Sequence, residues 1–73
     1  MSKHVTLLLG QRLRFLRKQQ HLTQEELADR AKINVKHLQR LEGKNPSRAN
    51  IESLQNIADA FEIPLWKLLK FKE

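Results

Sequence analysis

The side chains best suited to chemistry in this sequence are hydrogen-bond donors that follow Asn34. Leu38 and Leu41 are spaced for one helix face, so we expect both to point into a core. Lys36 and Arg40 then point away from that core. Lysine and arginine can donate hydrogen bonds to O6 and N7 of guanine. This segment therefore has side chains that could read DNA bases.

The charge of the chain also indicates a polyanionic partner. The net charge is +6, and residues 1–22 contain basic side chains without any acid. Residues 32–48 carry further lysines and arginines against a single acid, Glu42, whereas residues 49–73 are close to neutral. The positive charge is thus concentrated where DNA would be contacted. The alternative is an ordinary basic, solvated surface.

Other kinds of chemistry find little support. His4, His21 and His37 lie on separate segments without metal-ligand spacing, and cysteine is absent, so we expect no metal, no other cofactor and no disulfide. There is no phosphate-binding glycine loop and no carboxylate pair suited to a cleft, so no enzyme is expected. The longest apolar run, residues 7–9, is too short for a membrane span or a signal peptide. We expect an intracellular protein without a membrane partner.

Two short helices joined by a tight turn would hold the donors in place. Thr23 and Glu26 form a capping-box pattern at the start of the first helix, and Asn34 is a suitable N-cap for the second. Ala28 is small enough to let the two helices pack closely at an angle. Residues 23–42 are therefore the centre of the predicted fold.

Helical periodicity continues before this centre. Apolar residues recur every three or four positions from about residue 5 to residue 20, after a possible flexible tail at residues 1–4. Phe15 lies off the main apolar stripe. Either that tail covers Phe15 or another molecule contacts it, and we expect the intramolecular cover.

Two more helices are expected after the centre. Asn50 caps the first of them, which contributes core residues Ile51, Leu54, Ile57, Ala58 and Phe61. Pro64 starts the last, from Leu65 to about Lys70, with Leu65, Leu68 and Leu69 suited to packing inward.

This arrangement resembles the Cro and lambda-repressor-like helix-turn-helix family, also called the xenobiotic response element family. The resemblance rests on Gln24-Glu25-Glu26-Leu27-Ala28, on Asn34 and Leu38, on Leu41-Glu42-Gly43, and on the flanking residues 13–17, 50–61 and 63–69. The resemblance covers roughly residues 9–70 and implies an all-α fold, and we expect one compact five-helix domain over residues 1–73.

The resemblance also implies which residues contact DNA. The second helix of the motif, about residues 35–41, would lie in the major groove. Base contacts are then expected from Val35, Lys36 and Arg40, with Asn34, Gln39 and His37 as secondary candidates. Phosphate contacts are expected from Thr23, Gln24 and Arg17 and from the loop residues Lys44, Ser47 and Arg48.

Two further positions bear on the geometry of the motif. Family likeness pairs Arg17 with Glu42, an ion pair that would clamp the first helix to the end of the second helix of the motif. Lys32 departs from the family, which mostly has glycine at this turn because the backbone passes through positive φ. Either Lys32 adopts that conformation or the turn differs slightly.

The sequence predicts a transcriptional regulator, a repressor or also an activator, that binds a palindromic operator in double-stranded DNA. Trp66 and Phe71 would form the seam of a homodimer, and RNA polymerase is a conceivable second partner. Such a protein would act in the cytoplasm of a bacterium, with a bacterial or phage gene. The alternatives are a protein-interaction module that uses Phe15 or Trp66, and an excised domain of a longer repressor.

Overall fold

The computed structural model describes residues 3–43 and 49–70, and these residues form five α-helices without a strand. The helices are α1 (Lys3–Gln19), α2 (Gln24–Ala31), α3 (Val35–Glu42), α4 (Ile51–Ala60) and α5 (Leu65–Leu68). The predicted all-α, five-helix architecture is confirmed. No helix in the described part of the chain has the length and apolar character needed to cross a membrane.

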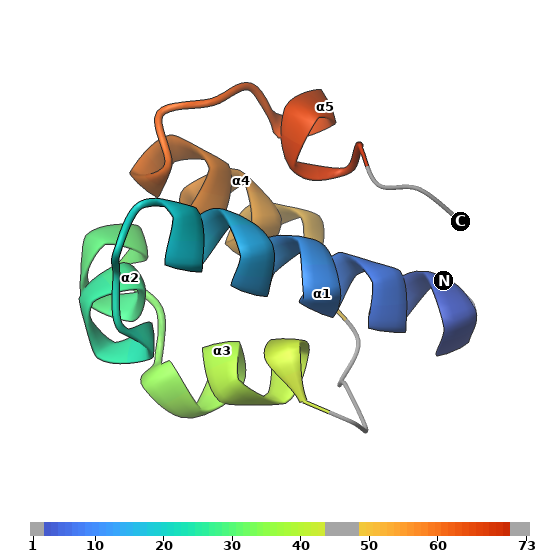
Figure 1. Cartoon of the computed structure of the whole chain (residues 1–73), viewed down its shortest axis with the longest axis horizontal. Helices are drawn as coiled ribbons and strands as arrows, with labels where there is room; N and C mark the ends of the chain where they lie inside the picture. Colours follow the sequence, from blue (N-terminus) through green and yellow to red (C-terminus); the bar gives the residue numbers. More distant parts are fainter. Residues whose placement is uncertain (1–2, 44–48, 71–73) are drawn as a thin grey trace.

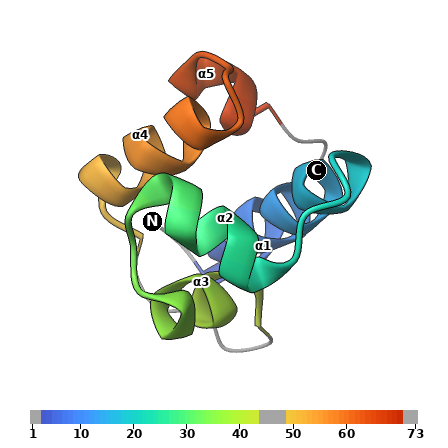
Figure 2. The same ribbon diagram turned by 90° about the vertical axis from the view of Figure 1, so that its left-hand side faces the viewer.

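One hydrophobic core joins all five helices. α1 packs against α3, α2 packs against both α3 and α4, and α4 packs against α5. Leucine and isoleucine side chains with almost no exposed surface fill the centre; these are Leu9, Leu13, Leu27, Leu38, Leu41, Ile57 and Leu68. In both ribbon views α3 and α5 lie on opposite sides of the molecule (Figures 1 and 2). The motif helix α3 is therefore fixed by its apolar side and leaves its polar side open.

Gly10 brings α1 close to the end of α3. A Cβ atom at this position would collide with the carbonyl oxygen of Leu41, so only glycine permits the observed approach. Glycine costs about 0.5–1 kcal/mol relative to alanine inside a helix, because it loses more backbone entropy on folding. That cost is the consequence of holding the two backbones together.

Several boundaries and burial expectations need correction. α1 begins at Lys3, so residues 3 and 4 are helical and not part of a flexible tail. α5 ends at Leu68, earlier than expected, and Leu69 after it is 37% exposed. Ile51 is 66% exposed because it is the first residue of α4 and lies beyond the core cluster.

Phe15 is not covered in the way we expected. Since Lys3 and His4 continue α1, they extend along the helix axis away from Phe15, whose side chain is 56% exposed. Instead, the Arg12 guanidinium carbon lies 6.0 Å from the centroid of the Phe15 ring. The same guanidinium donates a hydrogen bond of 3.0 Å to the carbonyl oxygen of Lys67, which joins α1 to the end of α5.

Candidate nucleic-acid interface

The first helix of the motif starts with the expected capping box. Thr23 Oγ1 accepts a hydrogen bond of 3.0 Å from the Glu26 backbone N–H, and the Glu26 carboxylate accepts one of 2.9 Å from the Thr23 backbone N–H. The hydrogen bond from the Thr23 backbone, with a smaller contribution from its hydroxyl, holds the pKa of Glu26 below its ordinary value of 4.5. Thr23 Oγ1 is thus already engaged inside the protein, although the residue is exposed.

The turn keeps the geometry that glycine usually provides. Lys32 has φ 56° and ψ 42°, the left-handed conformation, so this residue adopts the positive φ and the turn is not remodelled. Its N–H donates to Asp29 O, and the N–H of Ile33 donates to Ala28 O. These two bonds make the Schellman motif, which satisfies two of the carbonyl groups in the last turn of α2.

The second helix begins at an Asn34 cap, whose Oδ1 accepts a hydrogen bond of 2.7 Å from the Lys36 N–H. Leu38 and Leu41 are buried, whereas Lys36 and Arg40 are exposed. Gln39, the third candidate on this side of α3, is also exposed. The exposed side of α3 therefore carries long side chains with hydrogen-bond donors, and the buried leucines anchor the helix that carries them.

Two other candidates on α3 are less accessible than the sequence suggested. Val35 is half-buried and packs against the core cluster, so its side chain does not point fully away from it. His37 is also half-buried, and its Nε2 atom is buried without a hydrogen-bond partner among the described residues. Asn34, as the cap, has its side-chain oxygen occupied.

The expected ion pair between Arg17 and Glu42 is present. Arg17 Nε and Nη2 donate to the two carboxylate oxygens of Glu42 at 3.0 and 2.9 Å, and Arg17 Nη1 donates to Leu22 O at 2.9 Å. The side chains are only 11% and 3% exposed. Such a bidentate pair joins α1 to the end of α3, and its loss would leave a charge unpaired in a dry environment. Because its donors are satisfied internally, Arg17 is first a structural clamp.

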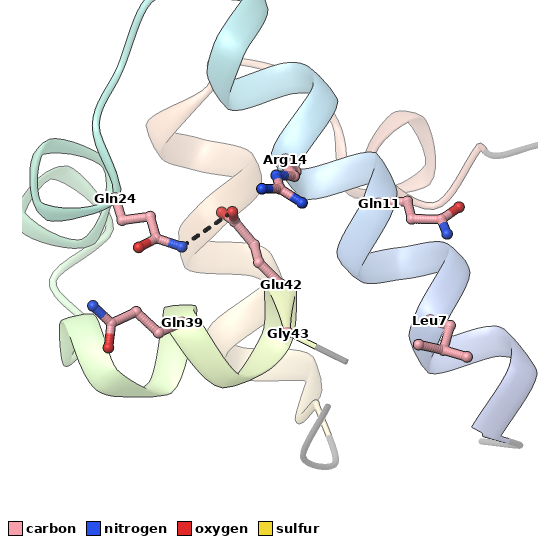
Figure 3. Close-up of a pocket in the computed structure, with 7 residues that line it drawn as sticks. All are labelled: Leu7, Gln11, Arg14, Gln24, Gln39, Glu42 and Gly43. Carbon is pink, nitrogen blue, oxygen red and sulfur yellow. Dashed lines mark hydrogen bonds between the residues drawn. The ribbon is translucent and has the colours of Figure 1, made fainter. Parts of the chain in front are cut away.

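Gln24, at the first position of α2, joins this pair. Its side-chain nitrogen donates to Glu42 Oε1 at 3.3 Å, a long hydrogen bond (Figure 3). The contact orients the Gln24 amide beside α3, near the first free N–H groups of α2. Helix N-termini of this kind bind phosphate oxygens because their N–H groups have no partner in the helix.

A cavity of about 410 Å³ lies where these elements meet. Its walls come from α1, from the start of α2 and from the end of α3; the lining residues are Leu7, Gln11, Arg14, Gln24, Gln39, Glu42 and Gly43 (Figure 3). The cavity brings together two candidates from the sequence, Gln24 and Gln39. It adds Gln11 and Arg14, which sequence reasoning missed, although both share with Leu7 one stripe of α1.

The remaining candidates lie elsewhere. Lys44, Ser47 and Arg48, expected to contact phosphates, and Phe71, expected at a dimer seam, lie outside the described residues. Trp66 is 63% exposed, and α5, to which it belongs, lies on the side of the molecule opposite α3 (Figure 1). No group of histidine, aspartate or glutamate side chains within the described ranges could hold a metal ion.

Comparison with known proteins agrees with this geometry. The helix-turn-helix family matches residues 13–65, well over half of the chain. No significant match was found among curated proteins. The matched segment includes the Arg17–Glu42 clamp, the capping box and the whole of α2, α3 and α4. The chain therefore belongs to the Cro and lambda-repressor-like helix-turn-helix family, whose members are DNA-binding transcription regulators.

Proposed function

We propose that this protein is a sequence-specific transcription regulator that binds a palindromic operator as a homodimer. The observation that carries the proposal is the exposed side of α3, where Lys36, Gln39 and Arg40 extend from a helix anchored by Leu38 and Leu41. Two such helices related by a twofold axis would enter successive major grooves, with half-sites about 10 bp apart or a multiple of that distance.

Base contacts are proposed for side chains of α3 and for its N-cap. Arg40 and Lys36 donate to guanine O6 and N7, and the methyl groups of Val35 contact a thymine methyl. Gln39 is a secondary base contact, together with Asn34 and His37. Val35 and His37 are half-buried, so their side chains would reach only bases that lie close to α3.

Phosphate contacts would fix the register of α3 in the groove. Gln24 and the N-terminus of α2 are the main candidates on one side of the recognition helix. Lys44, Ser47 and Arg48 follow α3 along the chain and remain candidates. Thr23 and Arg17 would contribute less, because their polar atoms are already hydrogen-bonded within the protein.

A second copy of the chain is the proposed partner of the surface at α5. Trp66 and Leu69 are exposed there, and α5 lies away from α3, so two copies could associate without covering the DNA-binding side. The homodimer would regulate transcription in a bacterial cytoplasm by blocking RNA polymerase or by contacting it from a neighbouring site. Glu25, exposed in the first turn of α2, is a candidate for the second mode.

Selection of bound duplexes from a random pool tests this function. Duplexes are selected in parallel with the wild type, with Arg40→Ala and with the control Arg30→Ala. The control removes an exposed arginine from the far end of α2. A salt concentration of about 150 mM suppresses purely electrostatic binding. We expect the wild type and Arg30→Ala to enrich the same inverted repeat, and Arg40→Ala to lose selectivity at one symmetric base pair. Recovery of random sequences by the wild type would contradict the proposal.

One observation favours a second candidate, a protein-interaction module that keeps the fold. Phe15 is 56% exposed on α1, with the Arg12 guanidinium as its neighbour in the described structure. Salt dependence separates the two functions. A protein that neutralises several phosphates loses DNA affinity steeply as the salt concentration rises. The affinity of an apolar contact between two proteins does not fall in this way.

A further inference from the structure

We propose that the cavity between α1, α2 and α3 binds a phosphate group of the DNA backbone, and that Arg14 is the residue that holds it. The inference rests on the proposed DNA-binding function and adds α1 to the elements that contact DNA. Arg14 is exposed and has no hydrogen-bond or ion-pair partner among residues 3–43 and 49–70. It points toward the carboxylate of Glu42 across the cavity (Figure 3).

The polar groups around the cavity match the chemistry of a phosphodiester. Arg14 offers the planar fork of a guanidinium, which binds two oxygens of one phosphate at once. Gln11, Gln24 and Gln39 also line the cavity, but in Figure 3 the amides of Gln11 and Gln39 point away from Arg14. One N–H of Gln24 already donates to Glu42 Oε1, so Arg14 is the main donor. With a volume of about 410 Å³, the cavity is within the usual size range for small-ligand sites.

Glu42 does not prevent an anion from binding here. Its carboxylate lies in the wall of the cavity, but it accepts two hydrogen bonds from Arg17 and one from Gln24. Its side chain is 3% exposed, so the positive charge of Arg17 balances it within the protein. The positive charge of Arg14 is then not neutralised by Glu42, and it faces the cavity.

The cavity also lies where a DNA strand would pass. Lys36, Gln39 and Arg40 share the exposed side of α3, because they recur at three- and four-residue spacing, and Gly43 follows as the C-cap. Gln39 and Gly43 line the cavity, whereas Lys36 and Arg40 do not. If α3 occupies the major groove, the phosphates along the edge of this groove would lie beside the cavity between α3 and α1. The apolar side chain of Leu7 could then contact a sugar.

The first test compares Arg14→Gln with the matched control Arg30→Gln, using the inverted repeat selected by the wild type. Arg30 is also exposed, but it lines a separate cavity between α2 and α4. We expect Arg14→Gln to weaken binding roughly tenfold for each half-site, because each protomer loses one charge-assisted contact. The slope of log K against log salt should fall in magnitude by about 1.8, because the dimer loses one phosphate contact, worth about 0.9, in each half-site. Base preferences should be unchanged. Arg30→Gln should match the wild type in both measurements.

Neutral methylphosphonates at single backbone positions identify the phosphate. The wild type should lose affinity at several such positions in each half-site, and at one of them Arg14→Gln should show no further loss. If Arg14→Gln binds like Arg30→Gln, or stays as sensitive as the wild type at every position, the proposal is wrong. Base reading by Arg40 would be untouched by that result, so the proposed function would still stand.

Free phosphate is the other source of the same chemistry. Inorganic phosphate at millimolar concentration, added to the wild type without DNA, should leave the Arg14 Nε–H resonance without a saturable shift. A single phosphate ion lacks the contacts that α3 makes with the bases of the same duplex. A saturable shift would assign the cavity to a free anion and would overturn its assignment to the DNA backbone.

Discussion

Lys32 stabilises the turn of the motif less well than glycine would. A residue with a Cβ in the left-handed conformation costs roughly 1–2 kcal/mol, and Lys32 has φ 56°. We expect Lys32→Gly to raise the free energy of unfolding by about 1 kcal/mol, since strain relief exceeds the entropy that glycine adds to the unfolded chain. Urea unfolding measures this change.

Glu62 supplies the matched control for that measurement. It follows the C-cap of α4 with φ 59°, outside the helix-turn-helix, so Glu62→Gly should give a similar gain in stability. DNA affinity should be unchanged in both variants because the helix angles stay the same. A fall in the urea midpoint of Lys32→Gly would show that the lysine side chain contributes more than its backbone conformation costs.

The capping box makes α2 sensitive to acid. The Thr23 hydrogen bonds hold the pKa of Glu26 below its ordinary value of 4.5, so the folded state binds this proton less readily than the unfolded chain does. The stabilisation is therefore present above pH 4.5 and is lost as the pH falls through the folded pKa. We expect the melting temperature of Glu26→Gln to vary less with pH than that of the wild type, from about pH 5 down to the pH at which the protein unfolds. An unchanged slope would contradict the capping role.

At the scale of helices, the contact between α1 and α3 depends on a charged pair. Glu42 accepts both hydrogen bonds of a bidentate pair with Arg17, and both side chains are almost fully buried. We expect Glu42→Ala to lower the free energy of unfolding by on the order of 3 kcal/mol, because Arg17 is left without its counter-charge. Chemical denaturation measures the loss.

Arg17 and Glu42 together give a sharper comparison. Replacing both by apolar residues of similar size, as in Arg17→Met with Glu42→Leu, removes the unpaired charge and should recover most of the lost stability. Equal stability of wild type and Glu42→Ala, together with equal DNA affinity, would show that the pair has no structural role.

The helices and most of the core followed from the sequence. Periodic apolar residues and N-caps such as Asn34 and Asn50 are local signals, and they fixed the order and type of all five helices. The expectation that Ile51 and Leu69 are buried in the core was wrong. Each has helical spacing but lies at the end of its helix, where spacing alone does not reveal whether another element covers it.

The site was predictable only in part. Lys36 and Arg40 followed from the two leucines that face the core, and the Arg17–Glu42 pair from family likeness. Gly10 and Arg14 were missed because their roles depend on how α1 crosses the end of α3, a distance that no local pattern encodes. That crossing is a property of the packed fold.

At the scale of the whole molecule, DNA binding and self-association are proposed for separate sides. α3 lies on one side of α1, and α5 lies on the other (Figures 1 and 2). The cavity is lined by α1, the start of α2 and the end of α3. This separation means that a substitution at one side should change one property. It also gives the homodimer proposal its test, because loss of self-association should leave the DNA-reading surface of each protomer intact.

Trp66 is the residue on which we expect self-association to depend. It is 63% exposed, and a twofold axis would bring two copies of this side chain into one interface. Buried tryptophans often contribute 2 kcal/mol or more to an interface, so Trp66→Ser should raise the dimer dissociation constant by about thirtyfold or more. Sedimentation equilibrium measures that constant. Phe15→Ser, which removes the exposed aromatic of α1, is the control and should leave it unchanged. A dimer that persists in Trp66→Ser but dissociates in Phe15→Ser would move the interface from α5 to α1.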